Sequence, residues 1–82
     1  MKAETCFNRR EVIQQMLEEG ESLQGLTFDF QFLFFNAAID HRPSGRSYRF
    51  GLNPEDTEAE IRYWLERARR DFHKKLANPD LL

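Results

Sequence analysis

The sequence predicts a small α+β domain in the order helix, strand, strand, helix, with an antiparallel β-hairpin packed on a long C-terminal amphipathic helix. Three observations lead to this fold class. Apolar residues recur with helical spacing over 57–76, and alternating segments flank a Pro- and Gly-containing turn at 41–46. The chain has 82 residues, which is enough for one hydrophobic core. We therefore expect a single domain over residues 1–82, with 1–7 as a loose lead-in and 78–82 as a loose tail.

The first helix is expected over residues 9–19. Asn8 is a good N-cap, and Glu11 follows three residues later, as in a capping box. Gly20 can end the helix in the left-handed conformation. The apolar stripe is narrow, so this helix should cover another layer rather than form a core by itself. The stripe consists of Val12, Ile13, Met16 and Leu17.

The segment over residues 26–42 fits two structures. From Leu26 to Phe32 apolar and polar residues alternate, and this part of the chain is rich in aromatic residues, which favours a half-buried strand. The Ala37-Ala38 pair and apolar residues at helical spacing favour a helix instead. We expect a strand, with an all-α domain as the alternative if residues 28–40 are helical.

A hairpin across the turn at 41–46 has one favourable register. If Asp40 lies opposite Ser47, apolar residues of the two strands face each other in three pairs, which is the register that a buried face selects. These pairs are Ile39–Tyr48, Ala37–Phe50 and Phe35–Leu52. The remaining phenylalanines then point to the other face of the hairpin, unless a bulge near 34–35 resets the alternation.

The last helix is expected over residues 57–76. Thr57 and Glu60 have the spacing of a capping box, which satisfies free N–H groups at the start of a helix. A continuous apolar stripe follows, as expected for a helix packed on a core. It consists of Ile61, Trp64, Leu65, Ala68, Phe72 and Leu76.

The sequence contains no pattern that indicates catalysis, a cofactor or a metal site. Cys6, His41 and His73 do not stand at metal-ligand spacing, and no nucleophile elbow or phosphate-binding loop is present. We therefore expect no enzyme activity, no catalytic residue, no metal, no cofactor and no small-molecule substrate. The single cysteine, the polar start and the shortness of the longest apolar run predict a cytoplasmic protein that does not bind membranes.

The number of phenylalanines points to a function in protein–protein binding. Five of the eight phenylalanines lie between Phe28 and Phe35. Two helices can cover only one face of a two-stranded ribbon, and an open apolar face is prone to association. We therefore predict a small regulatory protein that binds another protein or itself, forming a homodimer through a Phe-rich face. The predicted interface residues are Phe28, Phe30, Phe32 and Phe34.

The charge distribution supports an alternative function in nucleic-acid binding. The net charge of the chain is −2, yet residues 41–82 carry nine basic and seven acidic groups. Basic side chains on the hairpin and the last helix could contact phosphates. The candidates are Arg42, Arg46, Arg49, Arg69, Arg70 and Lys74. Basic residues at the end of a helix are also expected from the helix dipole alone.

Overall fold

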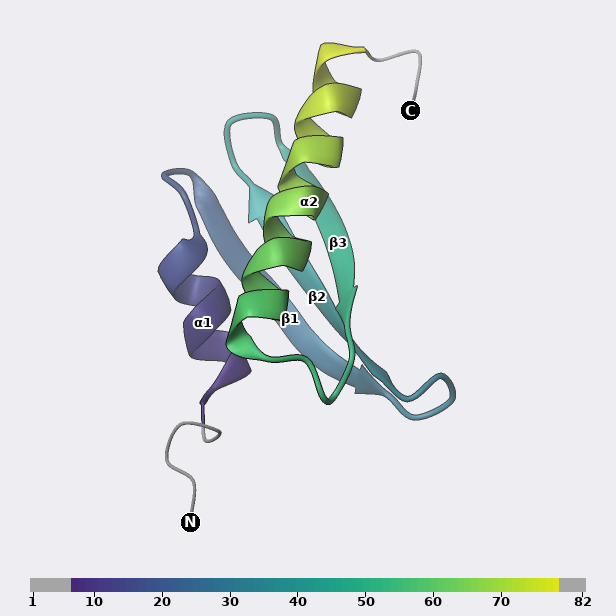
Figure 1. Cartoon of the computed structure of the whole chain (residues 1–82). Helices are drawn as coiled ribbons and strands as arrows, with labels where there is room; N and C mark the ends of the chain where they lie inside the picture. The colour runs from purple at the N-terminus through teal and green to yellow at the C-terminus, as the bar shows by residue number, and fades with distance from the viewer. Residues whose placement is uncertain (1–6, 79–82) are drawn as a thin grey trace.

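The computed structural model describes residues 7–78 and contains two helices and a three-stranded antiparallel sheet. Both helices lie on the same face of the sheet (Figure 1). The α+β class and the hairpin packed on a long C-terminal helix are confirmed, with one strand more than predicted. The expected loose tail except for Asn78, and the lead-in except for Phe7, lie outside the described residues. The elements are α1 (Arg9–Met16), β1 (Glu21–Asp29), β2 (Phe34–His41), β3 (Arg46–Leu52) and α2 (Glu58–Ala77).

The segment expected to be a single strand is divided by a turn, and the all-α alternative is wrong. The Asp29 side chain makes this turn: its Oδ1 accepts hydrogen bonds from the backbone N–H groups of Gln31 and Phe32, at 2.9 and 3.1 Å. The carbonyl of Asp29 also accepts from the N–H of Leu33 at 2.7 Å. Residues 30–33 therefore reverse the chain, and the polar residues after Gly20 become the first half of β1.

The register predicted for the second hairpin is confirmed. Residues of β2 and β3 pair as expected, and the Ser47 hydroxyl donates to the Asp40 carboxylate at 3.1 Å. In the first hairpin a bulge between Leu23 and Gly25 shifts the pairing by one residue. This bulge lets both Leu23 and Leu26 face the helices, since strict alternation would turn one of them to the opposite face.

Helix α1 begins as predicted and ends earlier. The Asn8 side chain accepts from the N–H groups of Arg10 and Glu11, at 2.9 and 3.2 Å. The helix stops at Met16 because Leu17 already has an extended backbone. Gly20 has a φ of +89°, but it shapes the turn into β1 instead of ending the helix.

Helix α2 has the predicted capping box: Thr57 Oγ1 accepts from the Glu60 N–H, and the Glu60 carboxylate accepts from the Thr57 N–H. Its stripe packs on the sheet, except that Trp64 stays 37% exposed at the flank of the helix. The buried core therefore lies between both helices and one face of the sheet. It consists of Val12, Ile13, Ala37, Ile39, Tyr48, Leu52, Ile61, Leu65 and Phe72.

Candidate functional site

The four phenylalanines predicted to form an interface do not lie on one face of the sheet. Phe28 pairs with Phe35 on the helix-covered face, where the two ring centroids lie 4.9 Å apart. Phe34 points to the opposite face and packs over Gly51, where a Cβ would lie 3.0 Å from its ring. Phe30 and Phe32 lie in the turn between β1 and β2. The expected Phe-rich sheet face is therefore absent from the described part of the chain.

The uncovered face of the sheet is mainly polar. Its register places these side chains outward: Ser22, Thr27, Asp29, Phe34, Asn36, Ala38, Asp40, Ser47 and Arg49. Only Phe34 among them is large and apolar. Hydroxyl, amide and charged groups remain solvated on such a surface, so it needs no partner to cover it.

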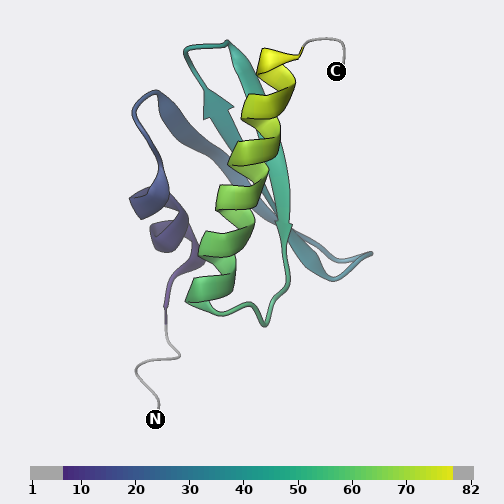
Figure 2. The same cartoon turned by 45° about the horizontal axis from the view of Figure 1, so that its top comes forward.

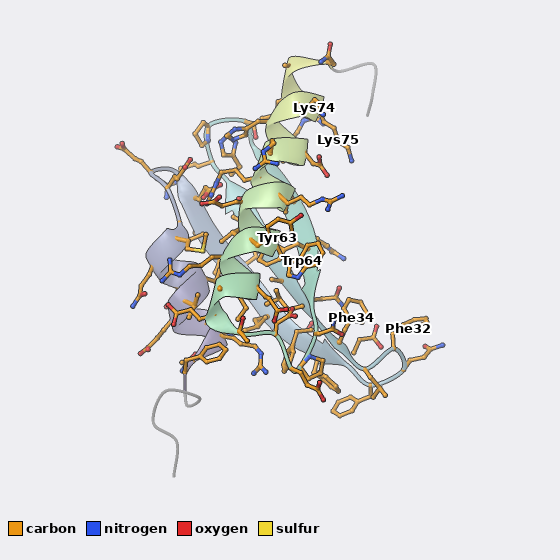
Figure 3. The ribbon with its side chains drawn as sticks, viewed as in Figure 1. Phe32, Phe34, Tyr63, Trp64, Lys74 and Lys75 are labelled. Atoms are coloured by element: carbon orange, nitrogen blue, oxygen red, sulfur yellow. The ribbon has the colours of Figure 1, made fainter. Side chains whose placement is uncertain are left out.

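The exposed aromatic surface is concentrated at the end of the first hairpin. Phe30, Phe32 and Leu33 are 82%, 67% and 62% exposed, and we call these three residues the apolar tip. The hairpin extends beyond the helices in both views (Figures 1 and 2), and Figure 3 shows Phe32 at its end. Leu33 has a φ of 57°, a left-handed backbone conformation that residues other than Gly and Asn rarely adopt. The apolar tip therefore combines exposed side chains with a strained backbone.

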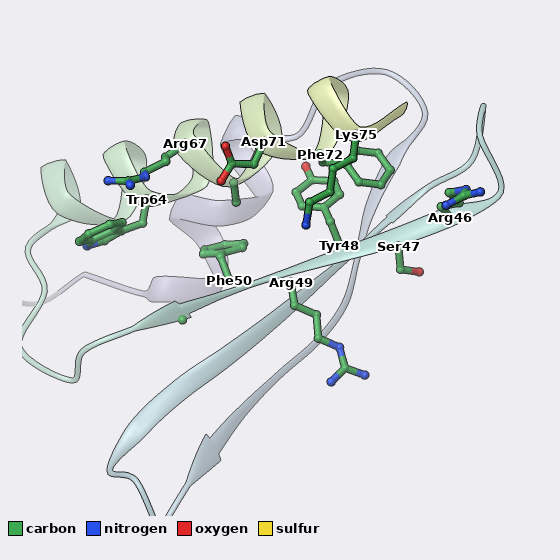
Figure 4. Close-up of a pocket in the computed structure, with 12 residues that line it drawn as sticks. Arg46, Ser47, Tyr48, Arg49, Phe50, Trp64, Arg67, Asp71, Phe72 and Lys75 are labelled. Atoms are coloured by element: carbon green, nitrogen blue, oxygen red, sulfur yellow. The ribbon is translucent and has the colours of Figure 1, made fainter. Parts of the chain in front are cut away.

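A second surface feature is a groove between α2 and β3, which we call the α2–β3 groove (Figure 4). Its cavity volume is about 850 Å³. Trp64 and Phe50 contribute apolar surface, and the stacked rings of Tyr48 and Phe72, with centroids 4.6 Å apart, lie further along it. The Arg67 guanidinium lies 5.9 Å from the centroid of the Trp64 ring. The lining residues are Arg46, Ser47, Tyr48, Arg49, Phe50, Gly51, Trp64, Arg67, Ala68, Asp71, Phe72 and Lys75.

The sequence did not single out this groove, although a signal for it exists. Trp64, Arg67, Asp71 and Lys75 recur at intervals of three and four, so they form a second stripe on α2 beside the apolar one. Trp64 was assigned to the core because it also fits the apolar stripe. Leu33 in the apolar tip was missed because no Gly, Pro or Asn marks that turn.

The six predicted phosphate contacts do not share one surface. Arg49 points away from α2, toward the uncovered face of the sheet (Figure 4). Arg70 and Lys74 are exposed on α2, but the Arg69 side chain is only 11% exposed and is held in an ion pair. Arg42 lies in the turn before β3, and Arg46 lines the α2–β3 groove. The basic groups are thus distributed around the molecule.

Arg69 belongs to a buried polar network with Glu21 and Tyr48. Its Nη2 lies 2.7 Å from Glu21 Oε1, and its Nε donates to Oε2 of the same carboxylate at 3.1 Å. The Tyr48 hydroxyl also donates to Oε2, and the Glu21 side chain is 2% exposed. This network connects β1, β3 and α2 at one point, so Arg69 has a structural role.

The pKa values of this network follow from burial and hydrogen bonding. Burial alone would raise the pKa of Glu21, but hydrogen bonds from Arg69, the Glu18 backbone and Tyr48 outweigh it and lower the pKa to about 2. Burial, together with the hydrogen bond to the Glu21 carboxylate, raises the pKa of the Tyr48 hydroxyl. The hydrogen bond to Glu21 raises the pKa of Arg69. The ion pair is therefore fully charged at neutral pH.

The two histidines lie close together without a carboxylate partner in the described residues. Their ring centroids are 5.7 Å apart, and His41 Nδ1 lies 2.8 Å from the Ser44 hydroxyl. Ser44 Oγ also donates to the His41 carbonyl and accepts from the Arg46 N–H. These hydrogen bonds shape the turn between β2 and β3, so the contact between His41 and Ser44 is explained by the structure of the turn.

Comparisons with protein-family models, curated proteins and solved structures found no match to this chain. Among residues 7–78 no group of three or more His, Cys, Asp or Glu side chains could hold a metal ion. Within the same range, no helix combines enough length with enough apolar character to span a bilayer.

Proposed function

We propose that this protein is a non-enzymatic interaction module that binds another protein by inserting the apolar tip into a concave apolar pocket. One observation carries this proposal. Phe30, Phe32 and Leu33 are the three most exposed large apolar residues of the described chain, and all three lie in one projecting turn. Contiguous exposed apolar groups of this kind mark binding surfaces, and a few aromatic anchors supply most of the energy of an interface.

The backbone of the turn supports a binding role. A left-handed conformation costs a residue such as Leu33 about 1–2 kcal/mol. Two N–H groups bound to the Asp29 side chain, and a third bound to its carbonyl, hold the turn in place. Strained backbone concentrates at functional sites, and a preformed loop loses little entropy on binding.

The size and shape of the apolar tip favour binding to a pocket of another protein over binding to the tip of a second copy of the chain. With about 150–250 Å² for each aromatic side chain, the three residues present on the order of 400 Å². Two tips in contact would bury about 800 Å² at most, below the roughly 1,200 Å² of a stable interface. Two convex tips also cannot enclose each other, whereas a pocket encloses the tip and the flanks of the hairpin. Homodimerisation through the tips alone is therefore expected to be weak.

Site-specific crosslinking tests this proposal. A photoreactive phenylalanine analogue at position 32 should form a crosslink to one partner in the source cells, and mass spectrometry would identify it. The purified partner should bind the Phe30→Ser, Phe32→Ser double variant at least about tenfold more weakly than the wild-type chain. The matched control is Tyr63→Ser, since Tyr63 is 57% exposed on α2, outside the apolar tip, and should bind normally.

Two results would overturn the proposal. Equal binding of the wild-type chain and the double variant would show that the apolar tip is not the anchor. A concentration-dependent dimer in light scattering, lost in the double variant, would identify a second copy of the chain as the occupant instead. We expect the wild-type chain and the double variant both to be monomers at micromolar concentration.

A further inference from the structure

We infer that the α2–β3 groove is a docking site for an extended acidic segment of a partner protein, which adds to the sheet as a fourth strand beside β3. This surface is separate from the apolar tip, so the inference goes beyond the proposed function. It rests on three properties of the groove: a free strand edge, an aromatic wall and an excess of positive charge.

The free edge belongs to β3. Within residues 7–78 the strand order is β1-β2-β3, so β3 pairs only with β2 along its seven residues. Along the other edge of an antiparallel strand, every second residue presents an N–H and a C=O without a partner in the sheet. An extended peptide can satisfy these groups by strand addition. The α2–β3 groove lies beside this strand, with residues 46–51 among its lining (Figure 4).

The aromatic wall would receive apolar side chains of the added strand. Side chains of a strand alternate between the two faces of a sheet, so every second side chain of the peptide would point toward α2. There it would meet Trp64 and Phe50, which project into the groove from α2 and β3 (Figure 4). Tyr63 stacks edge-on against Trp64, with ring centroids 5.0 Å apart, and supports its position.

The charge of the groove selects an acidic segment. On the α2 side three basic side chains line it against Asp71 alone, a net charge of +2 in a chain whose total is −2, and the fourth lining cation, Arg49, points to the other face of the sheet. None of these cations lies within 4 Å of a carboxylate in the described residues. Arg46, Arg67 and Lys75 would face one side of an added strand, and Arg49 would face the other. Acidic residues on the α2 side of the segment, beside the apolar ones, would therefore meet Arg46, Arg67 or Lys75, and an acidic residue on the other side would meet Arg49.

The same properties disfavour other occupants. A second copy paired edge to edge through β3 would bring two grooves of charge +2 together, and like charges across a strand pair are unfavourable. An oligonucleotide could neutralise the cations, but its phosphodiester backbone lacks the N–H donors that the carbonyl groups of the β3 edge require. An acidic polypeptide segment matches both the charge and the backbone edge.

A synthetic peptide tests the inference. The probe is a fluorescein-labelled octapeptide of glutamates with valine at its third position and phenylalanine at its fifth, so that one face of the extended peptide carries both apolar side chains and two glutamates. Its affinity is measured by fluorescence anisotropy. Arg67→Glu with Lys75→Glu should weaken binding at least about tenfold. The matched control is Arg70→Glu with Lys74→Glu, which changes the net charge equally on the same helix, outside the lining of the groove. The control variant should lose much less affinity for the peptide, because its new negative charges lie outside the groove and act on the peptide only through screened long-range repulsion.

Amide hydrogen exchange distinguishes strand addition from charge attraction. Bound peptide should slow the exchange of β3 edge amides at least several-fold in the wild-type chain. Binding without this protection would overturn strand addition, and equal losses in the two charge variants would overturn the groove as the site. Far-UV circular dichroism of both variants would confirm that they remain folded.

The remaining arms separate the other occupants and the two proposals. If an octamer of thymidine nucleotides displaced the peptide with higher affinity, the occupant of the groove would be a nucleic acid and the inference of an acidic polypeptide segment would be wrong. If the wild-type chain formed a dimer and the Arg67→Glu, Lys75→Glu variant did not, the occupant of the groove would be a second copy of the chain. The Phe30→Ser, Phe32→Ser variant should bind the octapeptide normally, so failure of the apolar tip and failure of the groove are distinguishable.

Discussion

Replacing Glu21 with glutamine removes the charge from a carboxylate that is 2% exposed and lies 2.7 Å from the Arg69 guanidinium. The shape of the side chain is preserved, so the change isolates the electrostatic contribution. The pKa of Glu21 is lowered from 4.5 to about 2, and each pKa unit corresponds to 1.36 kcal/mol, which gives about 3 kcal/mol at pH 7. Breaking one side of a buried ion pair costs about 3–5 kcal/mol, in agreement with this value. A chain of this size has a total stability of about 4–12 kcal/mol.

The stabilisation by Glu21 depends on pH in a defined direction. Because the pKa is lower in the folded state, the folded carboxylate resists protonation and its contribution is fully present above the unfolded value of 4.5. It is lost as the pH falls from about 5 toward 2. At pH 3 less than half of it should remain, and near pH 2 the wild-type chain and Glu21→Gln should differ very little.

Urea unfolding measures the difference in free energy of unfolding between the wild-type chain and Glu21→Gln, and it is carried out at pH 7 and at pH 3. The transition is followed by the fluorescence of the single Trp64 and by circular dichroism. The control is Glu18→Gln, since the Glu18 carboxylate lies 3.7 Å from Arg69 but is 61% exposed. Exposed pairs contribute about 0–1 kcal/mol, so this variant should change stability little. A loss in Glu21→Gln that stayed constant between pH 7 and pH 3, or that matched the loss in Glu18→Gln, would refute the reasoning.

Two predictions concern the turns. Leu33→Gly should raise the free energy of unfolding by about 0.5–1 kcal/mol, because relief of left-handed strain exceeds the added chain entropy of glycine; an unchanged urea midpoint would contradict this. Gly20→Ala should lower it by about 2 kcal/mol, since its φ is +89° and a Cβ would lie 2.8 Å from the Pro43 ring. The control Gly25→Ala, which meets no atom within 4 Å, should lose clearly less in the same urea experiment.

The parts of the fold that the sequence predicted depend on local signals. The capping box at Thr57 is encoded within four residues, and the register of the second hairpin follows from alternation on both sides of one short turn. In each case the residues that determine the structure are neighbours in sequence or face each other across a tight loop. Such patterns can be recognised without knowledge of the tertiary structure.

The parts that the sequence did not predict depend on longer-range contacts or on unusual turn chemistry. The Asp29 side chain forms a turn that contains no Gly, Pro or Asn, so the division between β1 and β2 was not recognised. Arg69 resembles any solvated helix cation until Glu21, 48 residues away, is placed beside it. The α2–β3 groove likewise exists only once α2 is placed against the last strand, and composition alone could not reveal it.

The strand order of the sheet affects how the chain folds. Each strand pairs with its neighbour in sequence through loops at 30–33 and 42–45, so both hairpins close over short distances and should form within microseconds. The Glu21–Arg69 contact closes a much longer loop, and we expect it to form after the transition state of folding. Loss of this contact should therefore accelerate unfolding and leave the folding rate nearly unchanged. We therefore expect the docking of α2 to control the lifetime of the folded state and the hairpins to control how quickly it is reached.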